Sequence, residues 1–133
     1  MKTFTSKSQK LGLLGEDIVC KYLRDRGFTI IERNYTKKWG EIDIIVAKEG
    51  MIRFIEVKSA TRDLGPNNHV LDAADLHRPE DGMHAAKRRR LSRTIQTYMA
   101  SMGDIEWHFD VACILIDPER RRARIKIMDD IVL

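Results

Sequence analysis

Two segments on either side of a short polar turn constrain the fold of this chain more than any other feature. Glu41–Ala47 and Ile52–Lys58 are rich in β-branched and aromatic residues, a composition that favours β-strands. Lys48-Glu49-Gly50 between them is typical of a tight hairpin turn. The sequence therefore predicts two adjacent antiparallel strands, with a register set by the turn.

That register places charged residues of the two strands opposite one another. The predicted pairs are Lys48–Met51, Ala47–Ile52, Ile45–Phe54, Asp43–Glu56 and Glu41–Lys58. Directly opposed residues have Cβ atoms roughly 4.5–5.5 Å apart. Two carboxylates at that spacing raise each other's pKa unless a cation lies between them. Oxygen ligands in this arrangement suit Mg²⁺ or Mn²⁺.

A structural interpretation of the same charges stays open at this point. Glu41 and Lys58 would form a cross-strand ion pair, and Asp43 would cap the open end of the hairpin. The apolar surroundings favour a site instead. One face of the hairpin carries Ile42, Ile44 and Val46, and the other carries Ile45, Ala47, Ile52 and Phe54. Strands that are apolar on both faces lie in the centre of a sheet, where charges are costly unless they act together.

Composition limits the classes of protein that the chain can be. Its 133 residues suit one domain with a core, 1–133, and the net charge of +4 with a pI of about 9.2 favours an anionic partner. Cys20 and Cys113 are far apart and predict buried thiols in a reducing compartment. The basic start of the chain has no apolar signal region, and no apolar run is long enough for a membrane span. We expect a cytoplasmic protein that does not bind membranes.

Hydrophobic periodicity and turn residues predict the remaining elements. We expect helices at Ser8–Arg26 and Met83–Met102, strands at Phe28–Tyr35, Glu106–Ile116 and Arg122–Met128, and a long polar connection at Ser59–Gly82. This order predicts an α/β fold with a mixed sheet of about five strands flanked by helices.

Three further groups of charged residues are candidates for function. Glu16 lies at the edge of the apolar stripe of the first helix, formed by Leu11, Leu14, Ile18, Val19, Tyr22 and Leu23. It either reaches inward or is a solvated acid. A basic run in the second helix comprises Lys87, Arg88, Arg89, Arg90 and Arg93, and an edge strand presents Arg122, Arg124 and Lys126. Both basic groups are either phosphate contacts or solvated faces. Lys87 falls on the apolar side of its helix, with Leu91.

The hairpin acids resemble a known nuclease signature. Asp43 followed by Glu56-Val57-Lys58 is similar to the PD-(D/E)xK motif. More narrowly, the chain resembles the YraN-type family of uncharacterised bacterial endonuclease-like proteins. The matching residues are Gly15-Glu16, Glu32-Arg33-Asn34-Tyr35, Gly40-Glu41-Ile42-Asp43, Glu56-Val57-Lys58, Lys87 with Leu91, and Phe109-Asp110-Val111. Glu16, Asp43, Glu56 and Lys58 together also resemble the site of archaeal Holliday-junction resolvases. The connection from Asn67 to Gly82 looks longer than is usual in the family.

The resemblance implies a restriction-endonuclease-like α-β-β-β-α-β core and a Mg²⁺- or Mn²⁺-dependent endonuclease acting on DNA. Branched DNA and recombination or repair intermediates are one option for its substrate, and the sequence leaves open which DNA structure is cleaved. Asp43, Glu56 and the Val57 carbonyl would hold the metal, with help from Glu16. Lys58 would orient water or stabilise charge in the transition state. Glu41 would support Asp43 or pair with Lys58, and Lys87 would touch a neighbouring phosphate.

Two other functions remain compatible with the sequence. One is a nucleic-acid-binding module of the same fold without turnover. The other is a dimeric structural adaptor in which an ion-pair network replaces the site. Bound Mn²⁺ or Mg²⁺ between Asp43 and Glu56 is expected only for the nuclease. The sequence leaves the oligomeric state open, with a homodimer as one option.

Overall fold

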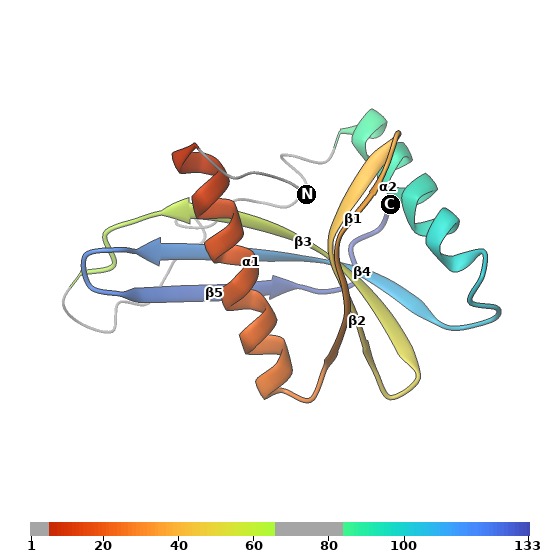
Figure 1. Cartoon of the computed structure of the whole chain (residues 1–133), viewed down its shortest axis with the longest axis horizontal. Coiled ribbons are helices and arrows are strands. Elements are labelled where there is room, and N and C mark those ends of the chain that lie inside the picture. The colour runs from red at the N-terminus through yellow and green to blue at the C-terminus, as the bar shows by residue number, and fades with distance from the viewer. Residues whose placement is uncertain (1–5, 66–83) are drawn as a thin grey trace.

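A computed structural model describes residues 6–65 and 84–133 of the chain. They form a five-stranded mixed sheet with one helix on each face (Figure 1). The elements in chain order are α1 (Lys7–Asp25), β1 (Thr29–Lys37), β2 (Gly40–Lys48), β3 (Met51–Thr61), α2 (Ala85–Met99), β4 (Trp107–Asp117) and β5 (Arg122–Met128). The predicted α/β class and the α-β-β-β-α-β core are confirmed. Spatial order follows chain order, and only the β3–β4 pair is parallel.

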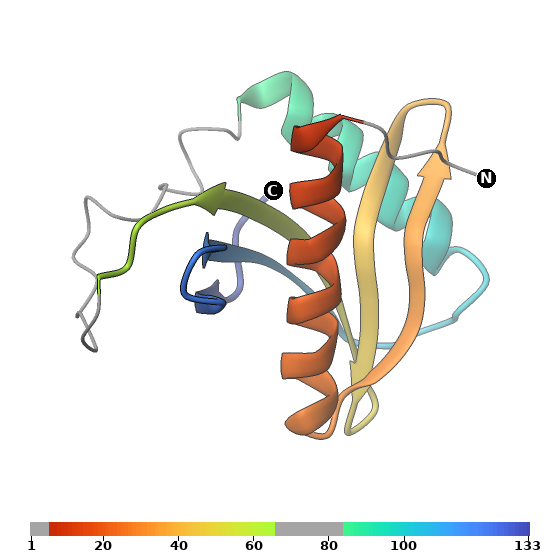
Figure 2. The same cartoon turned by 60° about the vertical axis from the view of Figure 1, so that its left-hand side comes forward.

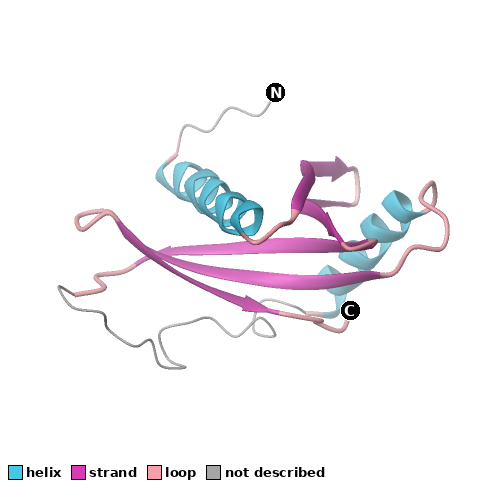
Figure 3. Cartoon of the chain, turned by 90° about the horizontal axis from the view of Figure 1, so that it is seen from below, coloured by secondary structure: helices cyan, strands magenta, loops and turns pink. Residues whose placement is uncertain are grey.

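The sheet has a separate hydrophobic cluster on each face. The α1 cluster joins Val19, Cys20 and Leu23 to residues of the sheet that include Ile44 and Ile55. The α2 cluster joins Leu91 and Ile95 to residues that include Phe54, Phe109 and Cys113. Figure 2 shows α1 crossing the near side of the sheet, and Figure 3 shows it above the long strands. Both cysteines are buried, as predicted.

The apolar stripe predicted for α1 is only partly correct. The helix begins at the N-cap Ser6, whose side chain forms a capping box with Gln9, and it ends before Gly27, which has a φ of +89°. Leu14 belongs to the predicted stripe but is 45% exposed. It lies with Ile18 over a pocket at the β4–β5 turn instead of within the core. Neither described helix is long and apolar enough to cross a bilayer.

The β2–β3 hairpin has the predicted register near its turn but not at its open end. Lys48–Met51, Ala47–Ile52 and Ile45–Phe54 are paired as predicted. The β2–β3 ladder ends at the pair Ile44–Ile55, so the predicted ladder pairs Asp43–Glu56 and Glu41–Lys58 are wrong. Beyond this point β3 stays paired with β4 as far as Thr61, so the predicted connection begins later than Ser59. Residues 66–83 of that connection lie outside the described residues.

The open end forms because β1 and β2 bend together. Ile42 packs in the α2 cluster, whereas Ile44 and Val46 pack in the α1 cluster, so the prediction that all three share one face is wrong. Asn34 has a φ of 55° between the pairs Arg33–Ile44 and Tyr35–Ile42. A left-handed residue in a strand breaks the alternation of side chains. In Figure 1, β1 and β2 run steeply, whereas the left-hand parts of β3, β4 and β5 run nearly horizontally.

Close contact between α1 and β3 holds the helix over this bend. A Cβ atom added to Gly15 would lie 1.9 Å from Ser59 Oγ and 3.2 Å from Ile114 Cγ2. We therefore expect Gly15→Ala to lower the free energy of unfolding by about 1–3 kcal/mol through overpacking. Gly12→Ala in the same helix is the matched control, because nothing lies within 4 Å of its added Cβ. The control should stabilise the protein by about 0.5–1 kcal/mol. Urea unfolding of both variants tests this, and equal effects would contradict the packing.

Candidate metal and nucleic-acid site

Asp43 lies where β2 separates from β3, and its carboxylate links β2 to the backbone of β3. Its Oδ2 accepts a hydrogen bond of 2.8 Å from the Val57 backbone N–H. Burial, with the charges of Glu16, Glu56 and Glu41, raises the pKa of Asp43 from 3.8 to about 7, although that hydrogen bond opposes the shift. The carboxylates of Glu16 on α1, Glu41 on β2 and Glu56 on β3 thus all act electrostatically on Asp43.

Glu56 faces α2, where Lys87 is its partner. Glu56 lies two residues after Phe54 on β3, so the two side chains share a face, and Phe54 packs in the α2 cluster. Lys87 Nζ lies 2.5 Å from Glu56 Oε1, and the two side chains are 29% and 18% exposed. Among the described residues, the buried Glu56 Oε2 has no hydrogen-bond partner. The placement of Lys87 on the inner side of its helix is confirmed, and half of the Glu56 carboxylate remains unsatisfied.

Glu16 reaches inward from α1, so its interpretation as a solvated helix acid is wrong. Its side chain is 13% exposed, and its Oε1 accepts a hydrogen bond of 3.4 Å from Arg33 Nη2. Burial raises the pKa of Glu16, although hydrogen bonds from Arg33 and Asn34 oppose that shift. Arg33 also bonds Asp17, at 2.8 Å. The bend residue Asn34 and its neighbour Arg33 therefore position Glu16 beside Asp43.

Lys58 follows Glu56 along the α2 side of β3. Its neighbour on β4 is Cys113, which in turn pairs with Lys126 of β5. Burial raises the pKa of the Cys113 thiol, and the charges of Lys58 and Lys126 oppose this shift. Glu56 and Lys58 therefore share one sheet face, as the spacing of two residues predicts.

These acidic residues have the donor atoms that a hard cation prefers, but their side chains are not close enough together to form a metal site. Within residues 6–65 and 84–133, no three His, Cys, Asp or Glu side chains are grouped closely enough to hold a metal. The carboxylates of Asp43 and Glu56 and the Val57 carbonyl are oxygen donors, which Mg²⁺ and Mn²⁺ prefer. A bound cation would give Glu56 Oε2 a partner and would favour the charged form of Asp43. The donor types of these residues fit such a cation, whereas their spacing in this structure does not.

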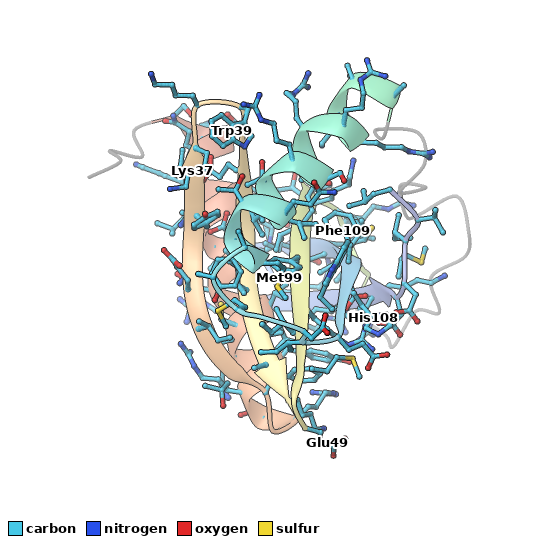
Figure 4. The ribbon with its side chains drawn as sticks, turned by 90° about the vertical axis from the view of Figure 1, so that its right-hand side faces the viewer. Lys37, Trp39, Glu49, Met99, His108 and Phe109 are labelled. Carbon is cyan, nitrogen blue, oxygen red and sulfur yellow. The ribbon has the colours of Figure 1, made fainter. Side chains whose placement is uncertain are left out.

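The basic residues of α2 divide into inner and outer groups. Lys87 and Arg88 are half-buried, whereas Arg89, Arg90 and Arg93 are exposed. The Arg93 guanidinium lies 4.0 Å from the centre of the Trp39 ring, in the β1–β2 turn. Figure 4 shows Trp39 and Lys37 at this turn beside α2. The exposed arginines therefore adjoin a second basic segment, Lys37-Lys38.

Sequence inspection missed this turn, although a signal was present. A Cβ atom on Gly40 would lie 2.5 Å from Thr94 Oγ1, so only glycine lets β2 approach α2 this closely. Gly40 directly follows Lys37-Lys38-Trp39 and directly precedes Glu41. A glycine within a strand can mark the close approach of another backbone, and Gly40 is that signal here.

The basic face predicted for β5 is partly occupied by structural contacts. Ala123, Ile125 and Ile127 pack against the α1 cluster. Arg122 donates through Nη2 to the carbonyls of Leu64 and Gly65. Arg124 is half-buried, and Lys126 is exposed. Arg122 thus ties the end of β3 to β5, which corrects its interpretation as an outward-facing phosphate contact.

Asp110, a residue of the matched Phe109-Asp110-Val111 segment, belongs to a different network. It is 1% exposed, and both of its oxygens accept hydrogen bonds from Arg53, at 3.0 and 3.1 Å. Its Oδ1 also accepts the backbone N–H of Asp130 at 3.0 Å. Asp110 therefore anchors the chain after β5 to the sheet.

The topology and the acids at the sheet bend define an α/β protein with a restriction-endonuclease-like core. The chain belongs to the uncharacterised protein family UPF0102, whose model matches residues 15–114, and this is the YraN-type family that the motifs resemble. A UPF0102 protein of Alkaliphilus metalliredigens is 36% identical over 116 residues, covering 86% of this chain and 92% of the relative. One from Campylobacter jejuni is 34% identical over 107 residues, covering 80% and 84% respectively. One from Campylobacter lari is 36% identical over the same length.

Proposed function

We propose that this protein is a Mg²⁺- or Mn²⁺-dependent endonuclease that hydrolyses phosphodiester bonds in DNA. The observation that carries the proposal is the set of four interacting carboxylates at Asp43, together with the unpartnered buried oxygen of Glu56. Buried like charges cost stability, and a bound cation removes that cost. An arrangement that destabilises the free protein at one point is typical of a binding or catalytic site.

The acidic residues would have distinct roles in this reaction. Asp43, Glu56 and the Val57 carbonyl would hold the cation, with Glu16 placed by Arg33 to assist. The bound cation would polarise the scissile phosphate and lower the pKa of a water molecule. Lys58 would stabilise negative charge that develops on the phosphate. Glu41 would add its charge to that of Asp43 and so increase the preference of the site for a cation.

A nucleic-acid surface adjoins these acids. It comprises the exposed residues Lys37, Lys38, Arg89, Arg90 and Arg93, joined through the contact between Arg93 and Trp39. Three further basic residues are candidates for phosphate contact: Lys126, which is exposed, and Arg88 and Arg124, which are half-buried. Such a surface suits the regularly spaced charges of a phosphate backbone and carries no base preference of its own.

A cleavage panel tests the proposed function. Linear duplex, single-stranded, nicked, flapped and four-way-junction DNAs would be incubated with the protein in Mg²⁺, Mn²⁺ or EDTA. We expect cleavage of at least one form with a cation present and none in EDTA. Binding without cleavage of any form would instead support a nucleic-acid-binding module. Lys87 and Arg33 favour that second candidate, because they already neutralise Glu56 and Glu16 in part.

The exposed arginines of α2 provide a prediction on affinity. We expect Arg89→Ala and Arg90→Ala each to weaken DNA binding about equally for all sequences. Each lost phosphate contact should reduce the slope of log affinity against log salt by roughly one. Arg24→Ala is the matched control, because Arg24 is an exposed arginine of the other helix, α1. Fluorescence anisotropy at several salt concentrations measures the slopes. If the two α2 variants keep the wild-type slope, their arginines form only a solvated face.

A further inference from the structure

Lys87 makes an ion pair with a carboxylate that the proposed metal site uses. Its Nζ lies 2.5 Å from Glu56 Oε1, and the charge of that carboxylate also acts on Asp43. The other oxygen of Glu56 is buried without a partner among the described residues. Lys87 therefore supplies the positive charge that the metal-free cluster lacks, but it satisfies only part of Glu56.

The position of Lys87 in its helix makes this ion pair replaceable. Lys87 lies in the first turn of α2, where its backbone N–H donates to the N-cap His84 at 3.4 Å. The N-terminus of a helix carries partial positive charge, which disfavours a lysine there. The first turn holds no acidic residue, so the negative charge comes from Glu56 on β3. A phosphate group would satisfy both Lys87 and the helix N-terminus at once.

We propose that Lys87 is the counter-ion of Glu56 in the metal-free protein. When a divalent cation binds the Glu56 carboxylate, Lys87 moves to a substrate phosphate. The cation and DNA therefore bind cooperatively. This inference rests on the proposed function. No covalent step is involved, because Lys87 exchanges one anionic partner for another. Without DNA, a cation competes with Lys87 for Glu56 and binds weakly. With DNA present, the displaced ammonium has a new partner and the competition disappears. Since linkage is reciprocal, the cation must strengthen DNA binding by the same factor.

The first test is calorimetric titration of the full chain with Mn²⁺ alone. Lys87→Met keeps the length of the aliphatic side chain and removes the charge. We expect it to bind Mn²⁺ roughly three- to tenfold more tightly than the wild type, as removal of a half-buried competing ion pair predicts. Lys87→Arg keeps the charge and should retain weak Mn²⁺ binding. Lys10→Met is the matched control for net charge, because Lys10 is exposed on α1, and it should leave Mn²⁺ affinity unchanged.

The second test repeats the titration with a short nuclease-resistant DNA duplex bound. The wild type should gain Mn²⁺ affinity in the presence of DNA, whereas Lys87→Met should gain much less. If the wild type binds both Mn²⁺ and DNA but Lys87→Met binds Mn²⁺ no more tightly, the role of Lys87 as counter-ion is refuted and the proposed function stands. If the wild type binds no Mn²⁺ with or without DNA, both proposals fail. If Lys87→Met does not fold, Lys87→Gln replaces it in both titrations with the same expectations.

Discussion

Asp43→Asn is expected to abolish cation-dependent DNA cleavage while leaving the protein folded. The substitution removes the charge that holds the cation, but its amide oxygen can still accept the Val57 N–H that Asp43 bonds at 2.8 Å. We expect the cleavage rate to fall on the order of 10³-fold, because even outer partners of metal ligands typically contribute about 10- to 100-fold. Single-turnover cleavage in Mn²⁺ measures the effect on the best substrate of the panel.

Glu56→Gln should cause a similar loss of cleavage but a different change in stability. It breaks the ion pair with Lys87, so the metal-free variant should lose about 0–1 kcal/mol of unfolding free energy. Glu119→Gln is the matched control for loss of one glutamate charge, because Glu119 is exposed in the β4–β5 turn. It should cleave at the wild-type rate. Retention of most activity by either Asp43→Asn or Glu56→Gln would remove these residues from the proposed chemistry.

The metal-free protein should become less stable as the pH rises from about 4 to about 7. Burial and neighbouring carboxylates raise the pKa of Asp43 from 3.8 to about 7, so the folded state binds more protons than the unfolded state in this interval. The contribution to stability is fully present below the unfolded pKa and is lost as the pH passes the folded pKa. We expect a loss of about 2–4 kcal/mol from Asp43. The raised pKa of Glu16 acts in the same direction.

Urea unfolding in EDTA at a series of pH values measures this dependence. Asp43→Asn should flatten most of the slope and exceed the wild type in stability by about 2–4 kcal/mol at pH 8. Added Mn²⁺ should restore stability to the wild type at pH 8, since binding to the folded state stabilises it. If Asp43→Asn were instead less stable than the wild type at pH 8, the Asp43 carboxylate would be a structural group and not a strained ligand.

Much of the fold follows from local sequence patterns. The Glu49-Gly50 turn fixes the hairpin register because a turn of this length permits only one pairing near it. The strand Arg122–Met128 has the predicted bounds because apolar and basic residues alternate along it. The start of α2 at Ala85, two residues later than predicted, reflects the N-cap role of His84, which has no strong sequence signal.

The geometry of the candidate site was less predictable because it depends on a bend. Strict alternation of side chains predicts that Asp43 lies opposite Glu56. The left-handed conformation of Asn34 interrupts this alternation in β1 and in its partner β2. Asparagine tolerates that conformation, yet many asparagines do not adopt it, so the sequence alone does not reveal the bend. Arg33 was likewise matched to the family without a role, because its contacts with Glu16 and Asp17 depend on how α1 crosses the sheet.

Diffraction from Mn²⁺-soaked crystals shows whether Asp43 and Glu56 bind a divalent cation. Anomalous diffraction locates Mn²⁺ independently of any assumption about the ligands. We expect a peak between the Asp43 and Glu56 carboxylates, with Lys87 withdrawn from Glu56 Oε1, and no such peak in crystals of Asp43→Asn. Saturating Mn²⁺ with no peak at these carboxylates and an intact Lys87–Glu56 pair would show that they do not form a cation site.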